Sequence, residues 1–144
     1  MIALFAIAVS TTNVAHAQLR KIPAEVTNSF AQKFPNATNV EWKDQLVDFK
    51  VAFDVNDKKY EAKFSNKGEW KVSIQEISVD KLPKKVVNGF SKSEYAQWEI
   101  KSVAFVQMPR KNNQYKITVA KNELNKKDLL FSPDGQLLKD SFTF

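Results

Sequence analysis

The chain of 144 residues contains no cysteine, a single histidine and only three glycines. Without cysteine there are no disulfide bonds, no thiolate metal ligands and no thiol nucleophiles, so packing alone must hold the fold. The glycines, Gly68, Gly89 and Gly135, lie too far apart to form a glycine-rich phosphate loop. These absences exclude several classes of enzyme, whereas the hydrophobic content of 43% is sufficient for a core.

The single histidine, His16, lies in an N-terminal segment that has the features of an export signal. Ile2–Val9 is an apolar run that is too short to span a bilayer, which needs about 20 residues. The sequence Ala15-His16-Ala17 has the small-x-small pattern of a signal-peptidase site, although a basic region before the apolar run is missing. We expect residues 1–17 to be a signal peptide rather than a buried strand, and the protein to be periplasmic or secreted. The mature chain then has no transmembrane segment.

Cleavage after Ala17 removes His16, and the mature chain then has neither histidine nor cysteine. This excludes a Ser-His-Asp triad, a cysteine nucleophile and a histidine-rich metal site. Paired carboxylates are the remaining catalytic option, since Asp48, Asp54 and Glu61 could share one face of a sheet. The segment Asp54-x-Asn56-x-Lys58 begins like a calcium loop, but it lacks the glycine at the sixth position and reads as a tight turn. We therefore expect no enzyme activity and no cofactor or metal.

The segment from Ile22 to Phe34 has apolar side chains at every fourth position, which predicts an amphipathic helix. Pro23 suits its first turn, and Pro35 ends it. A similar segment from Leu82 to Phe90 predicts a second helix. Pairs of identical residues lie 60 positions apart in the two segments: Pro23/Pro83, Val26/Val86, Asn28/Asn88 and Phe30/Phe90.

After the first helix the sequence alternates between apolar and polar residues in three runs, 47–55, 59–64 and 69–74, with a shorter strand expected at 40–43. Such alternation is typical of antiparallel strands with one buried face. Turns are expected at 56–57 and at 65–68, where Gly68 can adopt a positive φ. The residues expected to face the helix are Val47, Phe49, Val51, Phe53, Val55, Tyr60, Ala62, Phe64, Trp70, Val72 and Ile74.

The second half follows the same order, with strands expected at 98–105, 115–119, 129–131 and 137–144. Its turn Phe131-Ser132-x-x-Gly135 matches Phe64-Ser65-x-x-Gly68 at a distance of 67 positions, so seven residues are added, which we assign to the loops 108–113 and 121–127. The sequence predicts an α+β fold of two tandem repeats, 18–80 and 81–144. Each repeat is a helix packed on an antiparallel meander of three or four strands, and the two are joined in one curved sheet.

The net charge of +6 belongs to the second repeat. Residues 18–80 contain ten basic and ten acidic residues, whereas residues 81–144 contain twelve and six. Two basic loops carry candidate anion-binding residues, Arg110, Lys111, Lys126 and Lys127. Acidic residues are interleaved with them, so we expect no nucleic acid as a partner.

The export signal, the Ile-Pro and Leu-Pro helix openings, Phe34-Pro35-x-Ala37 and the two Phe-Ser-x-x-Gly turns resemble a known family. The chain from about Ile22 to Phe144 is similar to the PepSY-like, β-lactamase-inhibitor-like family of exported bacterial proteins. The resemblance implies tandem helix-plus-sheet repeats and a concave sheet face. The family is named for its similarity in fold to an inhibitor that binds an enzyme with this concave face. It brings no catalytic motif, and the inhibitor's protruding contact loop has no recognisable counterpart in this sequence.

These observations predict an exported, non-catalytic binding or inhibitor-like module, expected to be a monomer. Its partner would be an unidentified protein or peptide of the cell envelope, bound on the polar sheet face. Trp42, Trp70 and Trp98 are in phase with apolar neighbours and are expected in the core. The alternative is an envelope protein that binds a small or polymeric anionic ligand through the basic loops. The candidate partner-binding residues are Lys50, Glu61, Lys63, Lys71, Lys116 and Thr118.

Overall fold

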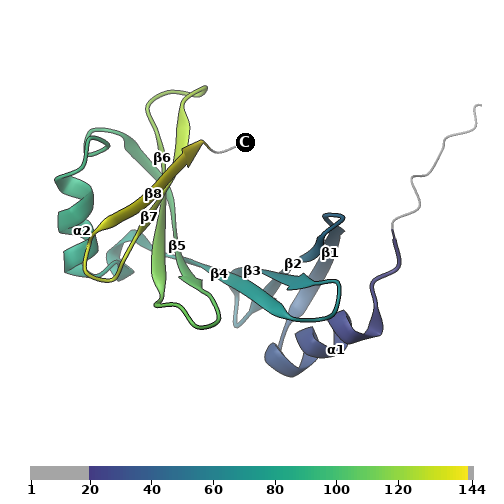
Figure 1. Ribbon diagram of the computed structural model, residues 1–144. Coiled ribbons are helices and arrows are strands. Elements are labelled where there is room, and N and C mark those ends of the chain that lie inside the picture. The colour runs from purple at the N-terminus through teal and green to yellow at the C-terminus, as the bar shows by residue number, and fades with distance from the viewer. Residues whose placement is uncertain (1–19, 143–144) are drawn as a thin grey trace, which may run out of the picture.

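The structure is a computed structural model that describes residues 20–142. One antiparallel sheet runs through the whole of this part of the chain (Figure 1). Its eight strands lie side by side in the order in which they occur in the sequence. The first half consists of α1 (Ala24–Lys33), β1 (Thr38–Asp44), β2 (Asp48–Val55), β3 (Lys58–Ser65) and β4 (Trp70–Ile77). After a 3₁₀ turn (Val79–Lys81) come α2 (Lys84–Ser91), β5 (Glu99–Gln107), β6 (Gln114–Ala120), β7 (Lys126–Phe131) and β8 (Leu137–Phe142).

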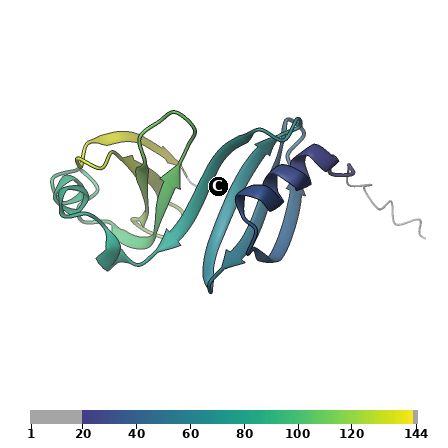
Figure 2. The ribbon, with the colours of Figure 1, turned by 90° about the horizontal axis from the view of Figure 1, so that it is seen from below.

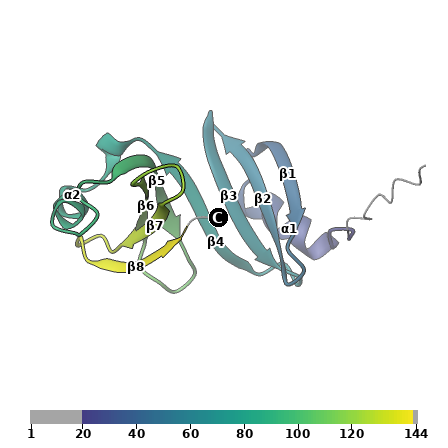
Figure 3. The same ribbon diagram turned by 90° about the horizontal axis from the view of Figure 1, so that it is seen from above.

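Both helices cover the same face of this sheet. Ala62 of β3 packs in the core under α1 and pairs with Ser73 of β4, and Ser73 pairs in turn with Gln107 of β5. Because paired residues share a face, Val103, four residues from Gln107 on β5, lies on the side of α1, and it belongs to the core under α2. Seen from below, α1 lies in front of β1–β4, and from above it lies behind them (Figures 2 and 3).

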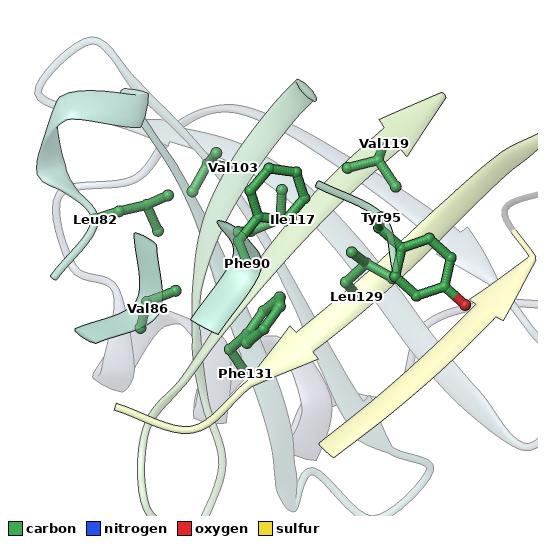
Figure 4. Close-up of a cluster of buried hydrophobic side chains, with 9 residues drawn as sticks. All are labelled: Leu82, Val86, Phe90, Tyr95, Val103, Ile117, Val119, Leu129 and Phe131. Carbon is green, nitrogen blue, oxygen red and sulfur yellow. The ribbon is translucent and has the colours of Figure 1, made fainter. Parts of the chain in front are cut away.

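Each helix buries two side chains over a separate core. Val26 and Phe30 of α1 pack with Phe49, Val51, Phe53, Ala62 and Phe64. In the second half, the nine buried residues are Leu82, Val86, Phe90, Tyr95, Val103, Ile117, Val119, Leu129 and Phe131 (Figure 4). The three tryptophans are partly buried against these cores, as expected. The β4–β5 ladder joins the two halves into one sheet that bends, with α1 and α2 on its outer side (Figure 1).

The glycine of a tight hairpin turn contacts the start of each helix. Gly68 has a φ of +84°, and a Cβ on it would lie 2.5 Å from the carbonyl oxygen of Glu25 in α1. Gly135 has a φ of +87°, and a Cβ on it would lie 2.0 Å from the carbonyl oxygen of Lys85 in α2. Glycine is required at both positions because no other residue combines this backbone conformation with so close an approach.

The structure confirms the α+β class, both helices and the single curved sheet, but it corrects the expected face of β4. A bulge at Lys71 shifts the register between β3 and β4, so that Trp70 faces α1 whereas Val72 and Ile74 point to the opposite side. Val47 was expected in the core, yet it precedes β2 and is 72% exposed. The predicted signal peptide, residues 1–17, and the last two residues of the chain lie outside the described residues. No helix within residues 20–142 is long and apolar enough to cross a membrane.

Candidate functional site

The face of the sheet opposite the helices, called the helix-free face here, carries a groove of about 480 Å³. It lies on the inner side of the bend and draws residues from β1 to β6. Its middle is apolar, with Ala52, Ile74 and Ala104 from three different strands. Its polar side chains are Asn39, Glu41, Asp54, Lys59, Glu61, Glu76, Ser102 and Lys116.

The strand register arranges the groove residues in two transverse rows. The first row runs Glu41, Ala52, Glu61, Ile74 and Val106 across β1 to β5. Side chains in such a row have Cβ atoms about 4.5–5.5 Å apart. Two carboxylates are therefore separated by one small alanine at one end of this row, and the other end is apolar.

The second row lies two residues further along the strands. It contains Asp54 paired with Lys59, and Glu76 paired with Ala104, which pairs with Lys116. Here acidic and basic side chains alternate. The groove is thus a hollow with a small apolar floor between charged walls, and four acidic residues line it against two lysines.

The predicted partner-binding residues all lie on or reach this face. Glu61 and Lys116 line the groove, and Lys50 forms an ion pair with Glu61. Lys63 pairs with Lys50 in the register, and Lys71, at the bulge, contacts the carboxylate of Asp48 at 3.7 Å.

Thr118, the last of these residues, lies on β6 two residues from Lys116. Its hydroxyl oxygen lies 2.6 Å from the carboxylate of Asp128 and donates a hydrogen bond to it.

Five residues of the groove were not predicted from the sequence: Glu41, Ile74, Glu76, Ser102 and Ala104. The register that joins their strands is not visible in the local alternation of apolar and polar residues.

The four predicted anion-binding residues do not come together. Arg110 and Lys111 lie in the β5–β6 turn, next to Gln114 at the start of β6, whereas Lys126 pairs with Ala120 at its end. A strand of seven residues spans about 23 Å. A single small anion therefore cannot contact both loops.

Lys127 faces the opposite side from Lys126 and belongs to a partly exposed hydrogen-bonded cluster at the edge of the second core, where Tyr95 is buried. Its ammonium group donates to the hydroxyl of Tyr95 at 3.1 Å and to the carboxylate of Asp140 at 3.2 Å. The Tyr95 hydroxyl also donates to Asp140. The hydrogen bond from Tyr95, followed by that from Lys127, lowers the pKa of Asp140, and the same contact with Asp140 raises the pKa of Tyr95.

The carboxylates considered for catalysis have other contacts. Asp48 contacts Lys71, Glu61 is paired with Lys50, and Asp54 accepts a hydrogen bond of 2.9 Å from the side-chain amide of Asn39. Asn56 and Asp57 have φ values of 51° and 61°, which identify the β2–β3 connection as a tight hairpin turn. Among residues 20–142, no group of three or more acidic, histidine or cysteine side chains is placed to hold a metal ion.

A family model described as "Putative beta-lactamase-inhibitor-like, PepSY-like" matches residues 46–139, which is well over half of the chain. The chain therefore belongs to this family, as the resemblance of its helix openings and turns predicted. No curated protein matches the chain.

Solved structures with the same fold come from several species of Bacteroides. A protein from Bacteroides eggerthii, described as a putative periplasmic protein, is 25% identical with a TM-score of 0.77, over 85% of this chain and 90% of that chain. A DUF2874 family protein from Bacteroides ovatus is 27% identical with a TM-score of 0.77, over 85% and 89% of the two chains. A BLIP-like protein from Bacteroides fragilis, 23% identical with a TM-score of 0.76 over 88% and 89%, shows the shared fold. The periplasmic description of the first agrees with the predicted localisation.

Proposed function

We propose that the protein is an exported, non-catalytic binding module that recognises a protein or peptide of the cell envelope on its helix-free face. The observation that carries this proposal is the groove on the inner side of the bend, with an apolar floor and charged walls. Protein interfaces commonly have this anatomy, an apolar centre inside a polar rim. The proposal includes cleavage after residue 17 and two tandem repeats, 18–80 and 81–144.

Family membership and shape support the same proposal. The family is described as inhibitor-like, and both helices lie on the outer side of the bend, which leaves the inner side open to a partner. A wide, open sheet face offers contacts from many strands at once, as docking of a polypeptide requires. We include Lys50, Glu61, Lys63, Lys71, Lys116 and Thr118 among the contacts.

The competing function is binding of an anionic ligand through Arg110, Lys111, Lys126 and Lys127. Because these residues lie at both ends of β6, only an extended, polymeric anion fits this alternative. Reversing the charge of Arg110, Lys111 and Lys126 abolishes binding under the alternative and leaves it intact under our proposal. Lys127 is kept in this test, because its ammonium group contacts Tyr95 and Asp140.

The proposal is tested by blocking the groove. Ile74 is a partly exposed floor residue, and Ile74→Arg fills the hollow with a long charged side chain. Val87 is 42% exposed on α2, so Val87→Arg is a matched control on the other side of the molecule. We expect immobilised residues 18–144 and the control to capture the same protein from envelope extract, and Ile74→Arg to lose it while keeping its circular dichroism spectrum. Equal capture by all three would contradict the proposal.

A further inference from the structure

Three lysines stand directly opposite one another on neighbouring strands. Lys43 of β1 pairs with Lys50 of β2, and Lys50 pairs with Lys63 of β3. The residues on either side of Lys50, Phe49 and Val51, are buried under α1, so the three lysines lie on the helix-free face. We refer to Lys43, Lys50 and Lys63 as the lysine row.

Such a row is unfavourable for the isolated fold. Like charges that stand directly opposite on adjacent strands destabilise a sheet. Glu61 compensates one of the charges by its ion pair with Lys50. Lys43 and Lys63 form no ion pair with any residue between 20 and 142. The row therefore leaves two uncompensated ammonium groups, one on each side of Lys50.

The lysine row borders the groove. It lies two residues along the strands from the row that contains Glu41, Ala52 and Glu61. Beyond it, the bulged Lys71 reaches Asp48 on the same face. The first half of the chain is neutral by count, but the register separates its charges into a positive row and an acidic groove wall.

We propose that the lysine row recognises carboxylate groups, and that the partner presents an acidic peptide segment beside the apolar groove. This inference rests on the proposed function and specifies the chemistry of its partner. A carboxylate above Lys50 can accept charge-assisted hydrogen bonds from Lys43 and Lys63 on either side. The charge complementarity also accelerates association.

An acidic peptide fits this surface better than a uniform polyanion. A polyanion that extends from the lysine row into the groove meets the carboxylates of Glu41, Glu61 and Glu76. A polypeptide can place acidic side chains over the lysines and apolar side chains over Ala52 and Ile74. The combination of a positive row and an apolar hollow thus selects a segment that carries both kinds of side chain.

The test is a titration of ¹⁵N-labelled residues 18–144 with the capped peptide Glu-Ala-Glu-Leu-Glu-Ala, followed by amide chemical shifts at low ionic strength. We expect the shifts to centre on the lysine row. The double variant Lys43→Gln with Lys63→Gln should bind roughly fivefold to tenfold more weakly, since two exposed ion pairs are lost. The matched control, Lys84→Gln with Lys92→Gln, removes two exposed charges from α2 and its end and should leave the affinity unchanged.

Four outcomes would overturn the inference. Chemical-shift changes centred on Arg110, Lys111 and Lys126 would assign anion binding to the second half. Equal weakening of peptide binding by both double variants would show that binding depends only on the net charge of the protein. Equal affinity for inorganic phosphate, added as a second probe, would contradict the assignment to a peptide. If the peptide fails while Ile74→Arg still abolishes capture of the envelope partner, the lysine row loses its role and the proposed function stands.

Discussion

At the residue scale, a close contact joins two glycines, Gly89 of α2 and Gly135 of the β7–β8 turn. A Cβ on Gly89 would lie 1.9 Å from the carbonyl oxygen of Gly135. By sequence alone Gly89 is only a weak helix former, and its replacement by alanine should stabilise α2 by about 1 kcal/mol. The contact reverses this expectation, because it leaves no room for a Cβ on Gly89. Sequence alone could not reveal it, since Gly135 lies far from Gly89 along the chain.

We therefore predict that Gly89→Ala destabilises the protein by about 1–3 kcal/mol, as overpacking of a close contact does. The control is Asn88→Ala on the exposed side of the same helix, which should change the unfolding free energy by no more than about 0.5 kcal/mol. Urea denaturation of both variants measures the difference. A Gly89→Ala protein more stable than the wild type would contradict the close contact between Gly89 and Gly135.

The Tyr95–Lys127–Asp140 cluster predicts a loss of stability in acid. The pKa of Asp140 is lowered by the hydrogen bonds from Tyr95 and Lys127, so the carboxyl binds its proton less tightly in the folded state. Its contribution is present above the ordinary carboxyl pKa and is lost as the pH falls through the lowered value.

Asp140→Asn should therefore reduce stability near pH 7 and flatten the fall in acid. Asp134→Asn, at an exposed ion pair with Lys85, should leave the pH profile unchanged. Urea midpoints measured from about pH 2 to about pH 7 distinguish the two. A wild-type acid limb retained in Asp140→Asn would refute the role of the cluster.

At the element scale, α1 and its strands could be predicted from the sequence because their signals are local. Pro23, Pro35 and the spacing of Val26 and Phe30 mark the helix, and strict alternation marks β2 and β3. The face of β4 could not be predicted in the same way. A bulge at Lys71 turns Val72 and Ile74 away from the helix, and a bulge depends on the partner strand rather than on the period of the bulged strand itself.

Phe30 is the main anchor of α1 on the sheet. Its ring lies 5.0 Å from that of Phe53, 5.2 Å from Trp42 and 6.2 Å from Phe64, in edge-to-face geometry. We predict that Phe30→Ala lowers the unfolding free energy by about 3–5 kcal/mol. Urea denaturation measures the loss, and the exposed Val87→Ala serves as the control. A loss below about 1 kcal/mol would mean that α1 is not anchored through this ring.

At the scale of the whole molecule, the two halves share a sheet but not a core. The α1 core and the α2 core consist of different residues, and the β4–β5 ladder of five residue pairs connects them. From its repeated helix and turn motifs the sequence predicted two tandem repeats, 18–80 and 81–144, and this organisation stays a prediction. The groove and the lysine row were not predictable, because they arise from the register between strands.

The separate cores predict separate units of local stability. In Phe30→Ala, amide protection against hydrogen exchange should fall in β2 and β3 and persist in β6 and β7. Native-state hydrogen exchange with mass spectrometry measures this directly. A uniform fall across all eight strands would show instead that the sheet unfolds as one unit.

The central claim, that the helix-free face is where a partner binds, is tested most directly by photo-cross-linking in envelope extract. A photoreactive amino acid is introduced either at Glu76, in the groove, or at Gln32, on the exposed side of α1. Our account predicts one dominant cross-linked partner from position 76 and none from position 32. Cross-links of equal yield from both positions, or from position 32 alone, would contradict it.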